Sequence, residues 1–264
     1  MILQLKIYIS TPETVPFQVT VTTGNGTPIT GSPFTISQAT PAVVSVGLGQ
    51  PTQMFLDLSD VNIVKNDKGL ILQGTKDFYV SFRMRHQNHA ETLISKGRPG
   101  IGTSFRLGST PQGGEVSIRN FVSSVMATEN NTVINLSDYN SNVVFVSGTG
   151  NITSDSQTFT LNQGESIVFS GYTDVTANWT GFIGASLTAT KPVAVSSGNA
   201  TGGVSNNGSD FTLDQIVSSS QIGTEYIFIE GNGLPQMELP LIIANEDNTQ
   251  IFVNGNTVAA ITLN

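Results

Sequence analysis

The segment Ala127-Thr128-Glu129-Asn130-Asn131-Thr132 returns 117 residues later as Ala244-Asn245-Glu246-Asp247-Asn248-Thr249. Each copy follows an apolar run, Phe121 to Met126 or Leu239 to Ile243, and leads into a second run in which apolar and polar residues alternate. Asparagine and aspartate tolerate the left-handed conformation and bond their own backbone, so each segment predicts a tight turn between two strands of a hairpin. The repeated hairpin predicts an all-β chain built from related units.

The rest of the chain agrees with this prediction. Only 11% of its residues are charged, and strand signals recur about every 8 to 12 residues between turns, a spacing typical of β-sandwiches and barrels. We therefore predict tandem β-sandwich-like modules: a β module over residues 1–72, a β-sandwich module over 73–220, and the start of a further, truncated β unit over 221–264. A parallel β-helix is the alternative, since Asn-rich turns also suit one, but no regular short period supports it.

Two local patterns predict strand boundaries in the second half of the chain. Proline has no N–H to donate to a ladder, so Lys191-Pro192 predicts the first residues of a strand that continues through Val193-Ala194-Val195. Residues 199–210, rich in Gly, Asn and Ser, form the longest predicted linker.

A candidate binding site comes from the run between Phe78 and Arg85. Apolar residues occupy its alternate positions and share one face of a half-buried strand, so Arg83 and Arg85 share the other face. Three further cations follow within about twenty residues. Guanidinium forks match carboxylate and sulfate groups, which suggests an acidic glycan as the ligand. The predicted site residues are Arg83, Arg85, Lys96, Arg98 and Arg106.

The distribution of charge limits the class of partner. The net charge is −8, yet residues 65–119 hold nine of the eleven Lys and Arg and both His, against four acids. A nucleic-acid-binding domain is normally basic overall, so we expect no nucleic-acid partner. A local basic face on an acidic body suits a small anionic ligand, an acidic glycan or an acidic neighbouring module. Solvated side chains without a partner are the alternative.

An ordered set of short motifs resembles a known family. The motifs are Phe78 to Phe82, Ser95-Lys96-Gly97, Gly102 to Arg106, Thr180-Gly181, Ala189, Lys191 to Gly198, Asp214-Gln215 and Gly223 to Tyr226. Together with the two Ala-x-Glu-x-Asn-Thr copies, they resemble the IgGFc-binding protein N-terminal domain family. The first three resemble the version found in large secreted surface proteins of the Bacteroidetes type, which are associated with adhesion and gliding motility.

The resemblance implies an extracellular, non-catalytic binding module. Its partners would be a surface glycan or a protein ligand, and neighbouring modules of the same polypeptide. Animal members tend to carry a cysteine after the equivalent of Ser197-Gly198, whereas this chain has no cysteine. Immunoglobulin binding is therefore not carried over.

Metal and cofactor sites are not expected. The absence of cysteine excludes disulfides and thiolate metal ligands. His86 and His89 are the two histidines, and positions three apart on a strand point to opposite faces, so they predict no zinc site. Gly97, Gly100 and Gly102 lack the Gly-Lys-Ser/Thr ending of a phosphate loop. The acidic turns at 129–131 and 246–248 could offer oxygens to calcium, but bonds to the turn backbone explain them equally well.

Catalysis and membrane insertion are not expected either. The chain has no Gly-x-Ser-x-Gly motif, and nothing selects a serine to partner either histidine. A polysaccharide-degrading enzyme, the catalytic alternative, would need two carboxylates facing each other across a groove. A structural spacer without a ligand is the other alternative. No apolar stretch approaches the roughly 18 residues of a membrane span. Met1 to Ile9 is typical of a strand, so we expect any export signal outside this sequence.

Overall fold

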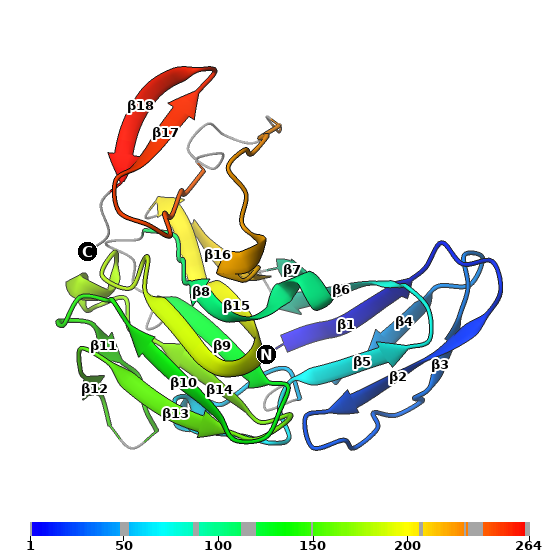
Figure 1. Ribbon diagram of the computed structural model, residues 1–264. Helices are drawn as coiled ribbons and strands as arrows, with labels where there is room; N and C mark the ends of the chain where they lie inside the picture. Colours follow the sequence, from blue (N-terminus) through cyan, green and yellow to red (C-terminus); the bar gives the residue numbers. More distant parts are fainter. Residues whose placement is uncertain are drawn as a thin grey trace.

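The chain folds into β-strands joined by turns. The computed structural model describes residues 2–47, 53–86, 90–111, 120–148, 150–205, 208–229, 231 and 240–261. Within these ranges there are eighteen strands and four short 3-10 segments, and no α-helix. The strand pairings between them are antiparallel. The all-β, sandwich-like prediction is therefore confirmed, and the parallel β-helix alternative is wrong for this part of the chain. Figure 1 shows two strand-built bodies side by side.

The first body consists of two facing sheets. One has the strand order β4-β1-β6-β7 and the other has the order β3-β2-β5. Their bounds are β1 Ile2–Ser10, β2 Phe17–Thr23, β3 Phe34–Ile36, β4 Ala42–Ser45, β5 Leu70–Gly74, β6 Tyr79–His86 and β7 Ala90–Ile94. Alternate residues of β1 and β2, including Leu5, Ile7 and Val19, are buried in one apolar core. This alternation leaves the other face of each sheet to solvent.

The second body is a seven-stranded sheet. Its strands are β8 Ile101–Arg106, β9 Phe121–Ala127, β10 Thr132–Ser137, β13 Gln157–Leu161, β14 Ser166–Ser170, β15 Ser186–Ser205 and β16 Gly208–Gln215. Five of these strands follow the order β13-β10-β15-β9-β14. The long strand β15 also pairs with the other two strands, β8 and β16. A small ribbon joins β11 Val144–Phe145 to β12 Ile152–Thr153. The 3-10 segments are η1 Leu58–Asp60, η2 Arg98–Gly100, η3 Thr176–Asn178 and η4 Ser219–Gln221.

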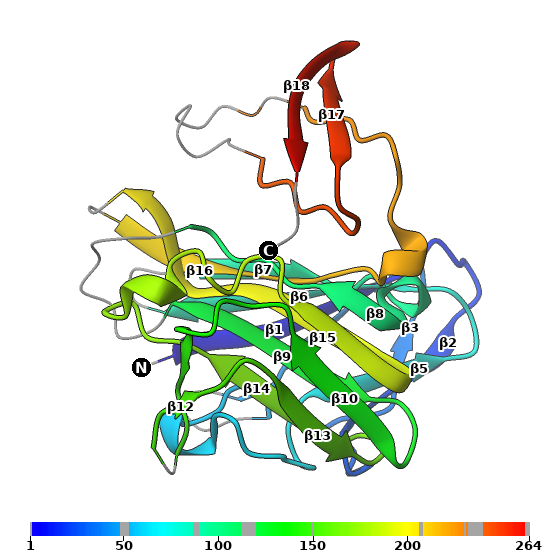
Figure 2. The same ribbon diagram turned by 60° about the vertical axis from the view of Figure 1, so that its left-hand side comes forward.

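A final hairpin stands apart from both bodies. It consists of β17 Thr249–Val253 and β18 Asn256–Ile261. Asn254 and Gly255, between the two strands, have positive φ of 50° and 81°, as a type I′ turn requires. Figure 2 shows the hairpin projecting away from the sheets. In the described ranges no helix has the length and apolar composition needed to cross a bilayer.

The repeated polar segment forms the same turn in both copies. Asn131 and Asn248 take the left-handed conformation, with φ of 57° and 59°. The hydroxyl of Thr132 donates to the carbonyl of Glu129 at 2.8 Å, and that of Thr249 donates to the carbonyl of Glu246 at 2.7 Å. The predicted turn is therefore confirmed in both places.

The predicted hairpin around the first turn is wrong. β9 and β10 do not pair with each other; both pair with β15, which meets β10 through residues 186–189 and β9 through residues 193–199. At the turn, the backbone N–H and the hydroxyl of Thr128 both donate to the carbonyl of Pro192, at 3.2 and 2.6 Å. Turn chemistry is local, whereas the partner of each strand is decided by a segment sixty residues away.

Two predicted boundaries also differ from the structure. Pro192 lies inside β15, where the register between β15 and β8 shifts between Thr188 and Val193. Pro192 has no N–H to donate, and it therefore lies where the pairing of β15 with β8 is interrupted, not at the start of a strand. The predicted linker at 199–210 instead continues β15 and begins β16, which pair with two register shifts. The many glycines and serines of this segment concealed its strand character.

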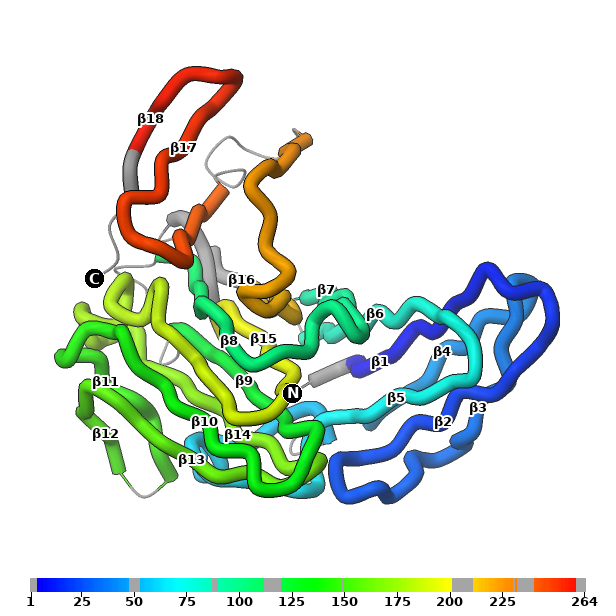
Figure 3. The backbone as a smooth tube through the Cα atoms, viewed as in Figure 1, coloured from blue at the N-terminus to red at the C-terminus, as the bar shows by residue number. Residues whose placement is uncertain are grey.

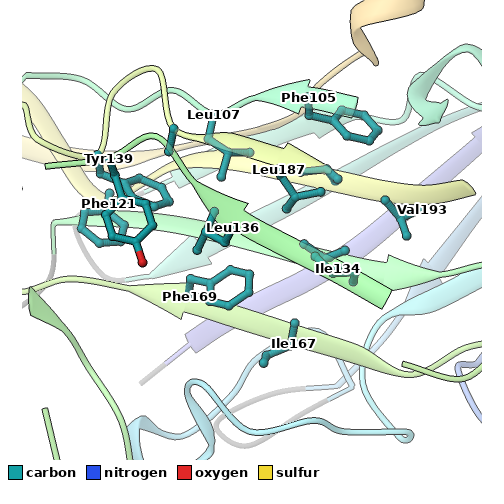
Figure 4. Packing of buried hydrophobic residues seen from close by; sticks show 14 of the residues in the cluster. Phe105, Leu107, Phe121, Ile134, Leu136, Tyr139, Ile167, Phe169, Leu187 and Val193 are labelled. Atoms are coloured by element: carbon teal, nitrogen blue, oxygen red, sulfur yellow. The ribbon is translucent and has the colours of Figure 1, made fainter. Parts of the chain in front are cut away.

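The core of the second body is rich in aromatic rings. Figure 4 shows side chains from β8, β9, β10, β14 and β15 meeting in one apolar layer. The rings of Phe121 and Phe182 stack at a centroid distance of 3.9 Å. Phe145 meets both edge-on, at 5.6 and 5.9 Å, and Tyr139 packs against Phe145. These rings are buried and link the sheet to the turns after β10 and before β15.

Two sets of contacts hold the bodies together. The backbone of Lys65 exchanges two hydrogen bonds of 2.8 Å with Ser166 of β14, and the N–H of Asn62 donates to Val168. Figure 3 shows this light-blue segment of the chain beside β14. At the other contact Asp214 and Gln215 of β16 bind residues 94–96. The first body therefore packs directly against the second.

Module boundaries within this arrangement remain a prediction. The division into residues 1–72, 73–220 and 221–264 separates β5 from β6, yet β6 pairs with β1 along its whole length. We therefore propose that the boundary between the first two modules lies after β7, near residue 95.

The contact between Gly24 and Gly164 predicts a large effect of one methyl group. Gly164 has a φ of 78°, and a Cβ added there would overlap the carbonyl of Gly24 in the first body. Gly164→Ala is expected to lower the free energy of unfolding by about 2–4 kcal/mol, through left-handed strain and this overlap. Chemical denaturation measures it.

Gly26→Ala is the matched control. Gly26 also has a positive φ, 84°, but an added Cβ would meet nothing within 4 Å. Its cost should stay near the roughly 1–2 kcal/mol of left-handed strain alone. Equal losses in the two variants would contradict a close approach of the two bodies at Gly164.

Candidate ligand-binding face

The outer face of the β4-β1-β6-β7 sheet gathers cations and tyrosines. Met84 of β6 is buried, so Arg83 and Arg85 on either side of it point to solvent. The register between β1 and β6 sets Lys6 opposite Arg83, and Ser10 opposite Tyr79. Tyr8 lies between Lys6 and Ser10 on β1. The guanidinium of Arg83 lies 4.8 Å from the centre of the Tyr8 ring. We name Lys6, Tyr8, Tyr79, Arg83 and Arg85 the cationic face.

The cationic face carries no carboxylate on its own four strands. Alternation and register place only Gln, Ser, Thr, Ala, Val and Ile at their other outward positions. Among the described residues, neither Arg83 nor Arg85 forms an ion pair. The ring of Tyr8 holds the Arg83 guanidinium by a cation–π contact, which leaves its N–H donors available. Within the described ranges, no ion pair therefore neutralises the two arginines of this face.

The other three predicted site residues are placed differently. Lys96 forms an ion pair of 2.7 Å with Asp214. Arg106 is mostly covered and donates to Asp138 at 3.0 Å and to the carbonyl of Gly184 at 3.1 Å. Arg98 is exposed at the start of η2. The structure thus brings Arg83 and Arg85 together, and gives Lys96 and Arg106 acidic partners of their own.

Two further lysines near the first body also form ion pairs with acidic side chains. Lys65 lies 2.7 Å from Asp60, and this hydrogen bond is the main cause that raises the pKa of the Lys65 ammonium. Lys76 pairs with Glu13 at 2.9 Å. Such exposed pairs contribute little to stability, but they compete with any external anion for these cations.

Lys6 and Tyr8 were absent from the predicted site. Alternation within Met1 to Ile9 already puts them on the face opposite Leu5 and Ile7. The missing information was that β1 pairs with β6, a contact across about eighty residues that no local pattern encodes. Once that pairing is known, Lys6 and Tyr8 are placed beside Arg83 on the same face of the sheet.

No metal centre emerges from the described ranges. They contain no group of three or more His, Asp or Glu arranged to hold an ion. His86 ends β6, and His89 lies outside the described residues. At the first acidic turn, Asn130 accepts from the N–H of Gln163 and from the ammonium of Lys191, at 3.0 and 2.6 Å. A calcium ion there would face this ammonium, so the turn is better described as structural.

Comparison with known families finds one match. The model of a family described as IgGFc binding protein matches residues 90–264, which begin at β7 and include the whole second body. Comparison with curated proteins and with solved structures finds no match. The five residues of the cationic face belong to the first body, and all of them lie outside the matched residues.

Proposed function

This chain belongs to the IgGFc-binding protein family, a family of binding domains, and from that premise we propose that it is a non-catalytic extracellular binding module whose cationic face binds acidic glycans. The observation that carries the proposal is the cationic face itself, which places three cations and two tyrosines, with no outward carboxylate, on one face of a four-stranded sheet. Its chemistry is that of recognition, because it offers donors and rings without a nucleophile beside a base.

Each part of the face suits a sulfated or carboxylated sugar. Arg83 and Arg85 stand two residues apart on one strand, so their side chains project side by side. A guanidinium gives two parallel hydrogen bonds to a carboxylate or sulfate. Tyr8 and Tyr79 offer flat apolar rings with a hydroxyl at the edge, which suit a surface that is partly wet. Lys6 adds a third positive charge opposite Arg83.

The charge of the whole chain supports the same ligand class. The net charge of the chain is −8. A local positive surface attracts anionic ligands to one place, whereas the negative remainder of the molecule repels them. The interaction should therefore weaken as salt rises, because exposed charges are screened within about 8 Å at physiological ionic strength.

The test removes both arginines. Arg83→Ala with Arg85→Ala is expected to weaken binding of a sulfated oligosaccharide at least about tenfold, which equals 1.4 kcal/mol. The physical reason is the loss of two charge-assisted hydrogen-bonding groups. Isothermal titration at low and at physiological salt measures the change.

The matched control changes the net charge equally. Lys65→Ala with Lys76→Ala also removes two positive charges, but from side chains that already pair with Asp60 and Glu13. This variant should bind within about twofold of the parent, because screening weakens distant charges. Binding that survives loss of both arginines, or falls equally in both variants, would contradict the proposal.

We propose a secreted, adhesive surface protein, of the gliding-associated kind, as the wider setting, with neighbouring modules as further partners. This part of the proposal rests only on the resemblance of the motifs between Phe78 and Arg106 to such surface proteins. A chain that binds no acidic glycan in the titration would instead be a spacer that positions other modules.

A further inference from the structure

The chain contains a second copy of more than the polar turn. Gly223-Thr224-Glu225-Tyr226 repeats Gly102-Thr103-Ser104-Phe105, with Gly, Thr and an aromatic ring at matching positions. The repeated turn follows in the same order, Ala127 to Thr132 and then Ala244 to Thr249. Residues 223–249 therefore correspond to the stretch that begins with β8 and continues through β9 into β10.

Strand register supports this correspondence. In the second body Thr132 of β10 pairs with Leu161 of β13. In the final hairpin the equivalent Thr249 of β17 pairs with Ile261 of β18. β17 thus matches β10 and β18 matches β13, with the short turn at Asn254-Gly255 in place of the longer connection that holds β11 and β12.

The two copies differ in what covers them. In the first copy β15 pairs with β8, β9 and β10 together, and Phe105 and Val125 are 1% exposed. The equivalent Tyr226 and Ile242 are 64% and 45% exposed. Among the described residues no strand pairs with 223–229 or with 240–243.

We propose that residues 223–229 and 240–261 bind, in antiparallel pairing, the β15-type strand of another module of the same architecture. The first copy defines what such a strand looks like. Leu187, Val193 and Val195 enter the core, and Lys191 is the one charged residue in the sequence from Ser186 to Asn199. The backbone of this strand forms hydrogen bonds to β8, β9 and β10. Strand addition of this kind takes affinity from main-chain hydrogen bonds and specificity from alternate side chains.

Exposure and charge both fit this occupant. Tyr226, Ile227, Phe228 and Ile229 form a continuous exposed apolar run, and such runs mark interaction sites. In the first copy the ammonium of Lys191 from β15 donates to the backbone carbonyl of Asn130 at 2.6 Å. The equivalent residue in the second copy is Asp247, whose carboxylate would add a negative charge beside that carbonyl and attract a lysine before the proline of the added strand.

The test adds a β15-type strand to the intact chain. A synthetic peptide with the sequence of residues 186–199 is the probe, and hydrogen exchange with mass spectrometry is the readout. Backbone amides within 223–229 and 240–243 should exchange at least about tenfold more slowly when the peptide is bound, because paired amides are protected. A peptide with Leu187→Asp and Val195→Asp should give no protection.

A chain variant completes the design. Phe228→Ser with Ile242→Ser changes only exposed side chains, so the variant should fold normally and lose the peptide's effect. No protection by the parent peptide would overturn the proposal, as would protection confined to residues 101–137, which would mean exchange with the chain's own β15. Protection of 223–229 and 240–243 that rises with protein concentration in the absence of peptide would also overturn it. In a second copy β15 is already paired with β8, β9 and β10, so the occupant would then be another segment and not a β15-type strand.

Discussion

Phe182→Ala is expected to lower the free energy of unfolding by about 3–5 kcal/mol, the usual range for removing a buried phenylalanine. The ring of Phe182 is fully buried and stacks on Phe121 at 3.9 Å. It also meets Phe145 edge-on at 5.9 Å. Its removal would leave a cavity in the core of the second body, and it would take away the ring contacts with Phe121, Phe145 and Tyr139. Urea denaturation followed by tryptophan fluorescence measures the loss.

An exposed phenylalanine provides the control. Phe252 on β17 is 60% exposed, so Phe252→Ala should change the free energy of unfolding by less than about 0.5 kcal/mol. A Phe182→Ala variant that is as stable as the Phe252→Ala variant would mean that the aromatic cluster does not hold the second body together.

Asn178→Ala is expected to cost about 3 kcal/mol, although asparagine contributes little apolar area. Its side-chain amide donates to the carbonyls of Val144 and Tyr172, at 3.0 and 2.9 Å, and its oxygen accepts from the N–H of Val144 at 2.9 Å. Asn178 is fully buried. Truncation leaves backbone groups unpaired away from water, and this costs more than the net value of the bonds themselves. Thermal unfolding by calorimetry measures the change.

Asn135 is the matched comparison. It lies on β10 and accepts a hydrogen bond of 2.9 Å from Thr158, but its side chain is exposed. Asn135→Ala should stay within about 0.5 kcal/mol of the parent, because water replaces the lost partner. Similar melting temperatures for both variants would show that Asn178 does not anchor the segment between β14 and β15.

Local patterns in the sequence predict the elements of this fold better than their arrangement. Alternation between Phe78 and Arg85 predicted both the strand and its wet face, and asparagine chemistry predicted the turn at Asn131. The partner of each strand could not be predicted, because β15 pairs with β8, β9 and β10 through contacts about fifty to ninety residues apart. Pro192 misled for a related reason, since a proline suits a break inside a ladder as well as a strand start.

In the candidate site, too, local patterns were predicted from the sequence and long-range contacts were not. The shared face of Arg83 and Arg85 was readable because it depends on strand periodicity alone. The acids that neutralise Lys96 and Arg106 were not readable, because Asp214 lies 118 residues from Lys96 and Asp138 lies 32 residues from Arg106. Lys6 needed the pairing of β1 with β6. Proximity in sequence therefore overestimated the number of cations that can act together.

The most direct test of the cationic face is a map of where an acidic glycan binds. Amide chemical shifts of the isotope-labelled chain, titrated with a sulfated oligosaccharide, report binding residue by residue. We predict that the largest shifts lie in β1, β6 and β7 around Lys6, Arg83 and Arg85, and that they shrink as salt is raised. Shifts confined to the second body or to the β17–β18 hairpin, or no shifts at all, would contradict this account.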